Sequence, residues 1–291
     1  MLDKGRSVGG RLATRRIGAA VLDHGAQFFT VRGDAFRAQV DDWLDRGVAQ
    51  VWCHGFSNLG DGYPRYVGSA GMTSLAKDLA TELDCRLDRL VFTLRRLADG
   101  WEVVVDDGTD VAADAVVLTA PVVQTWALLA QSGIELPDAL FRREYHRTIA
   151  LLTVLDRPSA VPDPGGVQLD PADPDAPFGF VGDNQQKGVS PVPAVTFHAT
   201  QPWSLAHWDD HQDTLRAALL ERAAPYLGEA EVVVAQVKKW RFAGPREPWD
   251  DPCWFDAEHR VVLAGDLFAG PKIEGAFNSG LAAGAALATL T

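Results

Sequence analysis

The C-terminal stretch from residue 260 constrains the fold more than any other part of the chain. After Arg260 the sequence is continuously apolar through Ala264, which is typical of a strand buried on both faces of a parallel sheet. Gly265-Asp266 follows, and residues from about 274 to 290, rich in small side chains, are predicted to form a helix. Such a helix can lie close to a sheet or a ligand, and its first turn can face a phosphate. The alternative is a helix whose small residues serve only packing.

The rest of the chain alternates between helical and strand-like patterns. Residues 115–118 form a second short apolar run, and Pro121 is well placed to begin a helix through about 130. Further predicted elements are antiparallel strands over 90–94 and 101–105, helices over 34–46, 72–83 and 213–224, and strands over 194–198 and 232–240. Residues 156–177, dense in Pro and Asp, are expected to form a loop, or a hairpin with a long loop, and not a core element. Helix 72–83 is expected to bury a stripe of Met72, Leu75, Leu79 and Leu83. The mixture predicts an α/β fold with an antiparallel insertion.

Composition argues against several classes of partner. The chain has 291 residues and a net charge of −12, so nucleic acid and anionic membrane surfaces are not expected partners. Three cysteines without a CxxC pair predict no disulfide framework and no zinc site, and they fit a reducing, cytoplasmic location. No apolar run approaches the roughly 18–20 residues that span a bilayer.

Two short motifs near the N-terminus are candidates for ligand binding. Asp3 stands at an apparent strand end, where an acid can accept hydrogen bonds from ribose hydroxyls. Gly9-Gly10 would let the backbone approach a phosphate, which Arg11 can neutralise. The segment 23–29, DHGAQFF, could line the face of a ring. The alternatives are a glycine-rich surface turn with a solvated Arg and an ordinary strand end.

Some residues suggest chemistry more weakly. His207 and His211 have a metal-chelating spacing but no third ligand, so a solvated helix face is expected. His198 is expected to be a hydrogen-bonded histidine of the core or of a pocket edge. Lys238 and Lys239 lie in a strand, whose alternation lets only one of the two face inward. A surface role for both is an equally good interpretation.

Six segments, taken in order, carry a resemblance to a known family. They are LDKGRSVGGRLATRR, DHGAQFFT, YVGSAGMTSLAKDLA, ADAVVLTAP, KKWRFAGP and LAGDLFAGPKIEGAFNSGLAAGAAL. In this combination the chain resembles the renalase-like branch of the flavin amine oxidase superfamily. The resemblance implies an α/β fold with two domains. The first is a Rossmann-like FAD domain of the glutathione-reductase or amine-oxidase type, related to NAD(P)-binding folds. The second is an inserted α+β substrate domain. The FAD domain would comprise 1–35, 66–135 and 258–291, and the substrate domain 36–65 and 136–257.

The resemblance also assigns roles to single residues. Asp3 would bind the adenosine ribose, and Val91 would approach the adenine. The residues expected near the diphosphate, ribityl chain and flavin ring are Gly9, Gly10, Arg11, Ala26, Gln27, Phe28, Asp266, Glu274, Gly275 and Ala276. The candidates for the pocket wall are Gln27, Phe28, His198, Trp240 and Phe242. No catalytic acid or base and no metal ligand is singled out.

The family opens with a strand, a GxGxxG turn and a helix, and this chain matches the family from within the second strand onward. We therefore expect the natural reading frame to begin about 30 residues upstream, the length of one βαβ opening. The missing opening contains the first strand, which is central in a sheet ordered 3-2-1-4-5, so the FAD domain would be truncated at its central strand. The strand that ends at Asp3 would then lack a ladder partner.

The resemblance implies a chemistry. The substrate would give a hydride to flavin N5, and O2 would reoxidise the flavin with release of H2O2. The expected substrate is an isomeric form of dihydro-NAD(P) or an amine, which residues 136–257 would select. Two alternatives stay open: a non-catalytic remnant or binding module that holds no FAD, and a different flavoenzyme such as a desaturase or a porphyrinogen oxidase.

Overall fold

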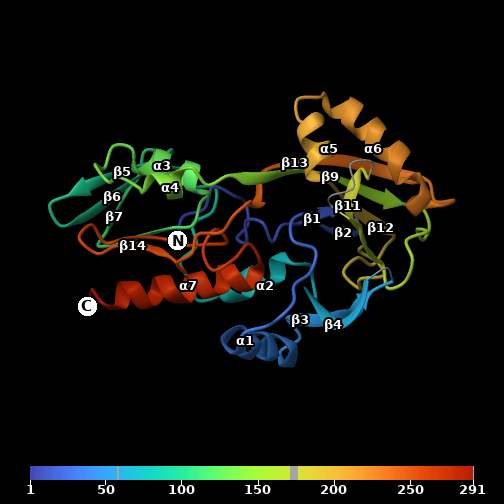
Figure 1. The fold of residues 1–291 in the computed structure, drawn as a ribbon, viewed down its shortest axis with the longest axis horizontal. Coiled ribbons are helices and arrows are strands. Elements are labelled where there is room, and N and C mark those ends of the chain that lie inside the picture. The colour runs from blue at the N-terminus through green and yellow to red at the C-terminus, as the bar shows by residue number, and fades with distance from the viewer. Residues whose placement is uncertain (58, 171–175, 291) are drawn as a thin grey trace.

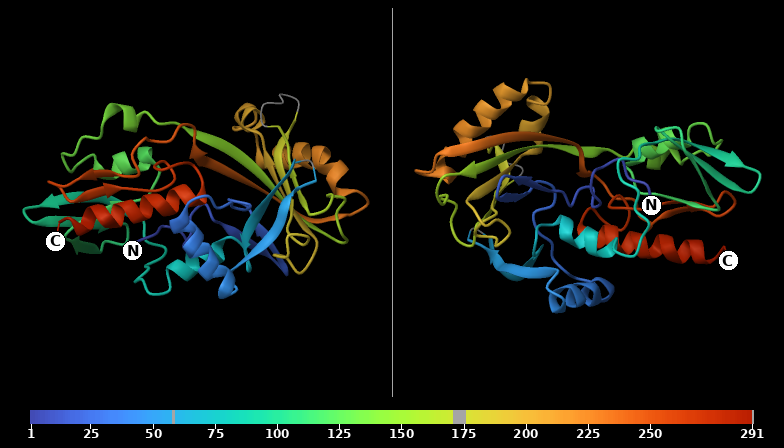
Figure 2. Two further views of the ribbon diagram at one scale, coloured as in Figure 1. Left: turned by 60° about the horizontal axis from the view of Figure 1, so that its bottom comes forward. Right: turned by 180° about the vertical axis from the view of Figure 1, so that it is seen from behind.

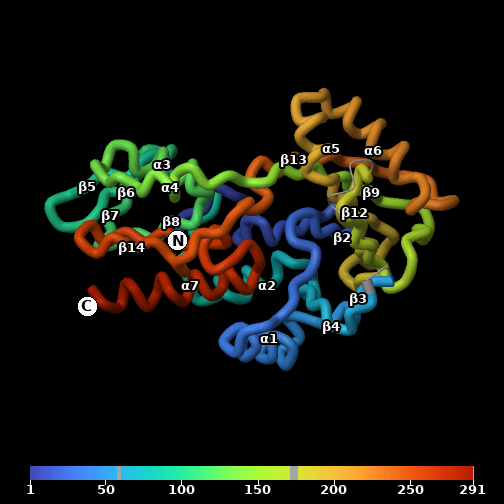
Figure 3. The backbone as a smooth tube through the Cα atoms, viewed as in Figure 1, coloured from blue at the N-terminus to red at the C-terminus, as the bar shows by residue number. Residues whose placement is uncertain are grey.

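The computed structural model describes residues 1–57, 59–170 and 176–290. They form two lobes joined by two long strands, β9 (Tyr145–Leu155) and β13 (Val232–Pro245), which cross from the left to the right of Figure 1. The left lobe holds both chain ends, and we call it the terminal lobe; the right one is the sheet lobe. The tube in Figure 3 shows that the first residues start in the terminal lobe and then enter the sheet lobe as β1 (Thr14–Ile17) and β2 (Ala20–Asp23).

The terminal lobe is built on a short parallel pair of strands. β8 (Val116–Leu118) pairs in parallel with β15 (Val261–Leu263), and β14 (Trp254–Asp256) adds an antiparallel strand. Val262 packs against Ala283 of α7 (Ile273–Ala288), while Leu263 faces the opposite way, into a core around Trp101. The other elements of this lobe are β5 (Val91–Leu97), β6 (Gly100–Val105), β7 (Asp110–Ala113), α3 (Val122–Leu129) and α4 (Asp138–Phe141).

The sheet lobe contains a five-stranded antiparallel sheet in the order β10-β11-β12-β9-β13. Alternation along β9 sends its side chains to two faces. Leu151 faces α6 (Gln212–Leu227), and the neighbouring Leu152 faces the β1–β2 hairpin, where it packs on Leu22. The remaining elements are β10 (Gly166–Gln168), β11 (Phe178–Asp183), β12 (Ala194–Ala199) and α5 (Gln201–Ala206). Figure 2 shows the helices on one side of this sheet and the hairpin on the other.

A third group of elements lies below both lobes. It consists of α1 (Asp34–Asp45), β3 (Ala49–Phe56), β4 (Leu59–Gly68) and α2 (Thr73–Leu79). Phe36, Trp43 and Tyr66 form its aromatic core. The ring of Phe36 lies 5.2 Å from that of Phe277, so α1 is fixed against α7.

Most predicted elements are confirmed, and the exceptions have identifiable causes. α2 ends at Leu79 rather than near residue 83, and Leu79 and Leu83 are 49% and 57% exposed. The chain turns there so that Arg86 can pair in parallel with Leu2, which gives the first strand a partner on one side. Val117 of β8 is 44% exposed, so this strand is not buried on both faces.

The α/β fold class is confirmed, but sequence reasoning missed β9, the strand that crosses between the lobes. The division into domains stays a prediction, although Leu136, Leu140 and Trp254 pack into the core of the terminal lobe. Of the loop predicted over 156–177, residues 171–175 lie outside the described residues. Within the rest, β10 pairs with β11 as a hairpin, and the prediction that the segment adds nothing to a core is wrong, because Val161 and Val167 pack into the core beneath α6. None of the described helices is long and apolar enough to cross a membrane.

A buried ion pair connects these parts. Lys187 Nζ lies 2.9 Å from Asp23 Oδ2, and both side chains are 0% exposed. The same ammonium donates to the Gln27 carbonyl at 3.0 Å. The other Asp23 oxygen accepts from Thr14 Oγ1 at 2.6 Å and from the Met72 N–H at 2.8 Å. One buried carboxylate therefore holds together the hairpin, the start of α2 and the turn after β11.

Replacing Lys187 with Met tests this role. The change leaves the Asp23 carboxylate buried without its cation, so we expect the free energy of unfolding to fall by about 3–5 kcal/mol. Urea unfolding followed by circular dichroism measures it. Arg142→Met, which removes a pair that is exposed at both residues, is the control and should cost little. The pairing account is wrong if the double variant Asp23→Asn/Lys187→Met is no more stable than Lys187→Met alone.

Candidate functional site

The predicted glycine turn and the acid after β15 meet in the structure. Gly9 and Gly10 have φ angles of 110° and 50°, and a Cβ on Gly10 would meet nothing within 4 Å. The turn is thus a left-handed, open stretch of backbone of the kind that can approach a phosphate. Next to it, Arg11 Nη2 lies 2.5 Å from Asp266 Oδ1, and Arg11 Nη1 donates to the Phe242 carbonyl at 3.3 Å. Two segments far apart in sequence thus form one polar centre.

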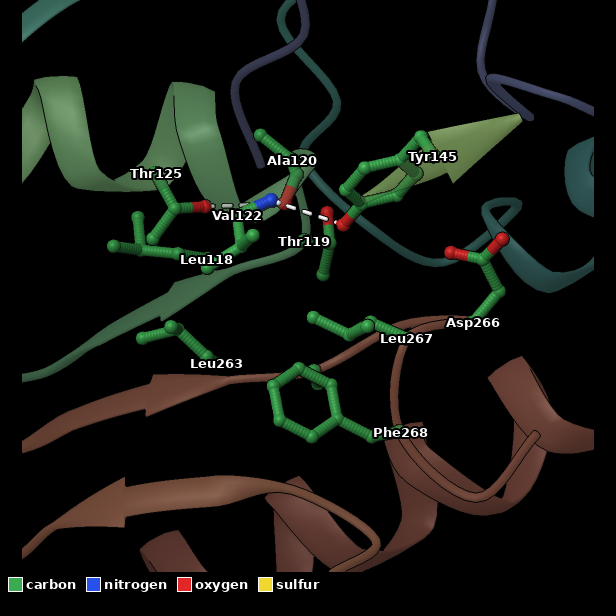
Figure 4. Close-up of a pocket in the computed structure, with 11 residues that line it drawn as sticks. Leu118, Thr119, Ala120, Val122, Thr125, Tyr145, Leu263, Asp266, Leu267 and Phe268 are labelled. Carbon is green, nitrogen blue, oxygen red and sulfur yellow. Dashed lines mark hydrogen bonds between the residues drawn. The ribbon is translucent and has the colours of Figure 1, made fainter. Parts of the chain in front are cut away.

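The carboxyl ends of the parallel strands β8 and β15 adjoin this centre. A small cavity of about 10 Å³ lies there. Figure 4 shows the residues that line it, with the Asp266 carboxylate and the Tyr145 hydroxyl among them. The Tyr145 hydroxyl accepts a hydrogen bond from the Val122 N–H at 3.0 Å. Burial raises the pKa of the Asp266 carboxyl, although the positive charge of Arg11 opposes that shift. Ligands of α/β sheets bind at this end of parallel strands.

The N-terminus of α7 faces the same region and has no side-chain cap. Its first intrahelical bond runs from the Ala276 N–H to the Lys272 carbonyl, so the N–H groups before Ala276 have no partner within the helix. Gly275 is required by packing, because a Cβ there would lie 2.0 Å from the Gly270 carbonyl oxygen. Glu274 accepts from the N–H groups of Arg32 at 3.0 Å and Gly33 at 2.6 Å. Its carboxylate therefore caps the start of α1.

The segment 24–28 runs beside the glycine turn. The Ala26 N–H donates to the Arg11 carbonyl at 2.8 Å, and the His24 N–H donates to the Ala13 carbonyl at 3.0 Å. The Gln27 amide is turned inward and donates to the Asp23 carbonyl at 2.7 Å. Phe28 joins an aromatic cluster with Trp52, Phe56 and Phe180.

One face of β13 covers this segment. Alternation places Lys238 and Trp240 on the same face, and the strand is irregular between Trp240 and Gly244, where Phe242 lies. Trp240 Nε1 donates to the His24 carbonyl at 2.7 Å, and the two rings stack with centroids 5.3 Å apart. His198 Nε2 lies 3.1 Å from the same carbonyl oxygen. The structure therefore brings together the predicted wall residues His198 and Trp240 at the His24 carbonyl.

Both histidines are held neutral. Burial, followed by the positive charges of Lys238 and Arg15, lowers the pKa of His24 to about 4. Burial likewise lowers the pKa of His198 to about 4, and the hydrogen bond to the His24 carbonyl only partly offsets it. A neutral His198 with its proton on Nε2 is the form that can donate to that carbonyl.

Asp3 and Val91, predicted for the adenosine end, belong to the edge of the terminal lobe. Asp3 Oδ1 accepts from the Gly5 N–H at 2.7 Å, and the Asp3 N–H donates to the Arg86 carbonyl at 3.0 Å. Val91 packs against the same core as Leu2. Their predicted contacts with a nucleotide stay predictions.

The weaker candidates have structural roles. His207 pairs with Asp210 at 2.8 Å, and His211 caps α6. No cluster of metal-ligating side chains occurs in the described ranges. Lys239 points away from Trp240 and donates to the Trp208 carbonyl. Sequence reasoning missed Lys187, because a lysine in the polar turn NQQKG carries no sign of burial.

Residues 49–288 match the family model described as flavin containing amine oxidoreductase. This span is most of the chain, so the chain belongs to the flavin-containing amine oxidase family, whose cofactor is FAD.

Solved structures with low sequence identity share the fold. A fatty acid isomerase from P. acnes is 10% identical, with a TM-score of 0.65 over 96% of this chain and 90% of the other. A putrescine oxidase double mutant is 15% identical, with a TM-score of 0.62 over 99% and 93%. A candidate protoporphyrinogen oxidase from Exiguobacterium sp. 255-15 is 17% identical, with a TM-score of 0.57 over 77%. The chain spans only 52% of the length of that protein.

The residues at this site fit FAD. The open backbone at Gly10 suits a phosphate, and Arg11 supplies the charge to neutralise it. The uncapped N-terminus of α7 supplies N–H donors and a partial positive charge. Asp266, held by Arg11, can accept a hydroxyl hydrogen bond. Figure 4 shows its carboxylate projecting beside the cavity.

The low pKa values of His24 and His198 predict acid sensitivity. The unfolded chain binds more protons than the folded one between pH 6.5 and about 4, so their contribution to stability is complete above pH 6.5 and is lost as the pH falls towards 4. Each contributes at most about 1.4 kcal/mol per pH unit. We expect His24→Gln to flatten the dependence of the unfolding free energy on pH in this window. An unchanged profile would contradict the burial of a neutral His24.

Gly275→Ala tests the close approach of α7. The new methyl group collides with the Gly270 carbonyl, so we expect a loss of about 1–3 kcal/mol and displacement of the loop 265–270. Gly284→Ala in the same helix is the matched control, because nothing lies within 4 Å of its Cβ. That change should be neutral or stabilise by up to about 1 kcal/mol. Equal melting temperatures for the two variants would show that α7 is not held at this distance.

Proposed function

We propose that the chain is a renalase-like oxidoreductase that uses FAD to oxidise a small reduced molecule. The observation that carries this proposal is the position of Trp240, whose ring covers the segment that runs alongside Arg11 and Asp266. FAD, when bound, would accept a hydride from the substrate at N5 and pass the electrons to O2, which leaves as H2O2.

The roles of the protein side chains follow from their contacts. Arg11 and the turn at Gly9 and Gly10 would hold the cofactor, together with the uncapped end of α7. Trp240 and His24 form a stacked, half-buried wall that orients a flat substrate and excludes water. Neither His24 nor His198 carries a charge at neutral pH, because burial lowers both pKa values to about 4. The site therefore suits hydride transfer, which needs no general acid.

The substrate classes to be tested are an isomeric dihydro-NAD(P) and an amine. In this proposal the FAD domain comprises 1–35, 66–135 and 258–291, and the inserted part selects the substrate. Its face towards the hairpin supplies His198 and Trp240, from β12 and β13. A cytoplasmic location and a small-molecule substrate complete the proposal.

Anaerobic reduction tests the function. The purified protein should show the visible absorption band of oxidised flavin, and a dihydronicotinamide isomer or an amine should bleach it. Admitting air should restore the band and produce H2O2. Trp240→Phe removes the hydrogen bond to the His24 carbonyl, worth about 1 kcal/mol, so bleaching should slow roughly fivefold.

Trp208→Phe is the control for that variant. Trp208 packs with the helices on the opposite face of the sheet, so its replacement should leave the rate unchanged. A flavin band that none of these compounds bleaches would favour a different flavoenzyme, such as a desaturase or porphyrinogen oxidase. A colourless protein that takes up no added FAD would favour the non-catalytic binding module.

A further inference from the structure

Three basic side chains converge beside Trp240 without a matching acid. Arg15 comes from β1, His24 from the end of β2, and Lys238 from β13. No ion pair between described residues involves Arg15 or Lys238, although most other arginines of the chain are paired. Asp23 is the nearest acid in sequence, and its carboxylate is engaged by Lys187, Thr14 and Met72.

Two atoms of this cluster are buried without a hydrogen-bond partner. They are Arg15 Nε and His24 Nδ1. Buried polar atoms are normally satisfied, so these two atoms have hydrogen-bonding capacity that a water or a ligand can use. An Arg Nε–H is a donor only, and it therefore calls for an acceptor such as an oxyanion.

The side chains of Arg15 and Lys238 are only half-buried, so both can be reached from solvent. His198 on β12 and Lys238 on β13 are both in register with Ala150 of β9, and the three side chains lie in one row on the face towards the hairpin. The hairpin covers the middle of this row, because Ala150 is 0% exposed and His198 Nε2 lies 3.1 Å from the His24 carbonyl oxygen. An anion would therefore approach at the Lys238 end of the row, next to Arg15.

The charges in this cluster interact. The positive charges of Lys238 and Arg15 add to burial in lowering the pKa of His24. Arg15 also adds to burial in lowering the pKa of Lys238. A group with negative charge would relieve this repulsion, whereas a cationic group would increase it.

The cluster continues directly from the proposed cofactor centre. Phe242 contacts Arg11 through its carbonyl, in the irregular stretch of β13 between Trp240 and Gly244. Trp240 and Lys238 precede this stretch and lie on one face, about 7 Å apart at 3.3 Å per residue. A flat ring against Trp240 would therefore direct a substituent towards Lys238 and Arg15.

We propose that Arg15, Lys238 and the His24 ring edge bind an oxyanion, a phosphate or a carboxylate, on the molecule that this site oxidises. The inference rests on the proposed function and sharpens its substrate class. An anionic substrate such as a dihydronicotinamide nucleotide fits the cluster, and a simple cationic amine does not.

Calorimetry with matched ligand pairs tests the proposal. Nicotinamide mononucleotide and nicotinamide riboside differ by one phosphate, and benzoate and benzamide differ in bearing a carboxylate or an amide. The protein is saturated with FAD first, so that its nucleotide site is not available to the probes. We expect the anionic member of at least one pair to bind roughly tenfold more tightly, and the favoured pair identifies phosphate or carboxylate.

Single substitutions test which residues cause the preference for the anionic probe. Arg15→Gln and Lys238→Met should each abolish most of the preference, while Arg16→Gln should preserve it. Arg16 is the matched control, because it neighbours Arg15 on β1 but is exposed. Equal affinities within both pairs, or a preference that survives both variants, would overturn the proposal.

The same experiments distinguish failure of the proposed function from failure of the oxyanion site. If the protein takes up no FAD, its visible spectrum shows this before any probe is added. Inorganic pyrophosphate is then titrated into the same protein and into Arg15→Gln. Binding that depends on Arg15 would support the oxyanion site independently of the flavin chemistry, and its absence would overturn it.

Discussion

The buried ion pair between Asp23 and Lys187 is the constraint on which the arrangement of the site depends. Taking two charges out of water costs several kcal/mol for each ion, so such a pair is kept only where hydrogen bonds satisfy its remaining atoms. Here Thr14, Met72 and Gln27 provide those bonds. Because each partner belongs to a different segment, the pair specifies how the hairpin meets α2 and the turn after β11. Asp23 therefore fixes the position from which the next segment, 24–28, continues.

Segment 24–28 contacts residues of both lobes. The backbone after Asp23 runs beside Arg11, which pairs with Asp266 at the end of β15. The same backbone offers the His24 carbonyl to Trp240 and His198 of the sheet lobe. The cofactor centre and the wall of the substrate side are thus held by neighbouring residues. Membership of the flavin-containing amine oxidase family gives this geometry its cofactor.

Sequence reasoning predicted the parts of the site that local chemistry determines. The helix after Asp266, the glycine turn before Arg11 and the strand bearing Trp240 all follow from runs of characteristic residues. The features that sequence reasoning missed depend on contacts between residues far apart in the sequence. β9 was not predicted, and without it the row of His198, Ala150 and Lys238 has no register. The contact of Glu274 with the cofactor stays a prediction; sequence reasoning missed that both its oxygens accept from the backbone before α1, from the N–H groups of Arg32 and Gly33.

Arg11, beside its open glycine turn, is the residue that we propose holds FAD in this chain. Calorimetric titration of the purified, flavin-stripped protein with FAD tests it most directly. We predict saturable binding of one FAD per chain, weakened roughly tenfold in Arg11→Gln. Because this variant also removes the ion-pair partner of Asp266, its unfolding midpoint should fall, and the titration is made at a temperature where circular dichroism shows both proteins folded. Absence of saturable binding, or equal affinity in wild type and Arg11→Gln, would contradict the claim.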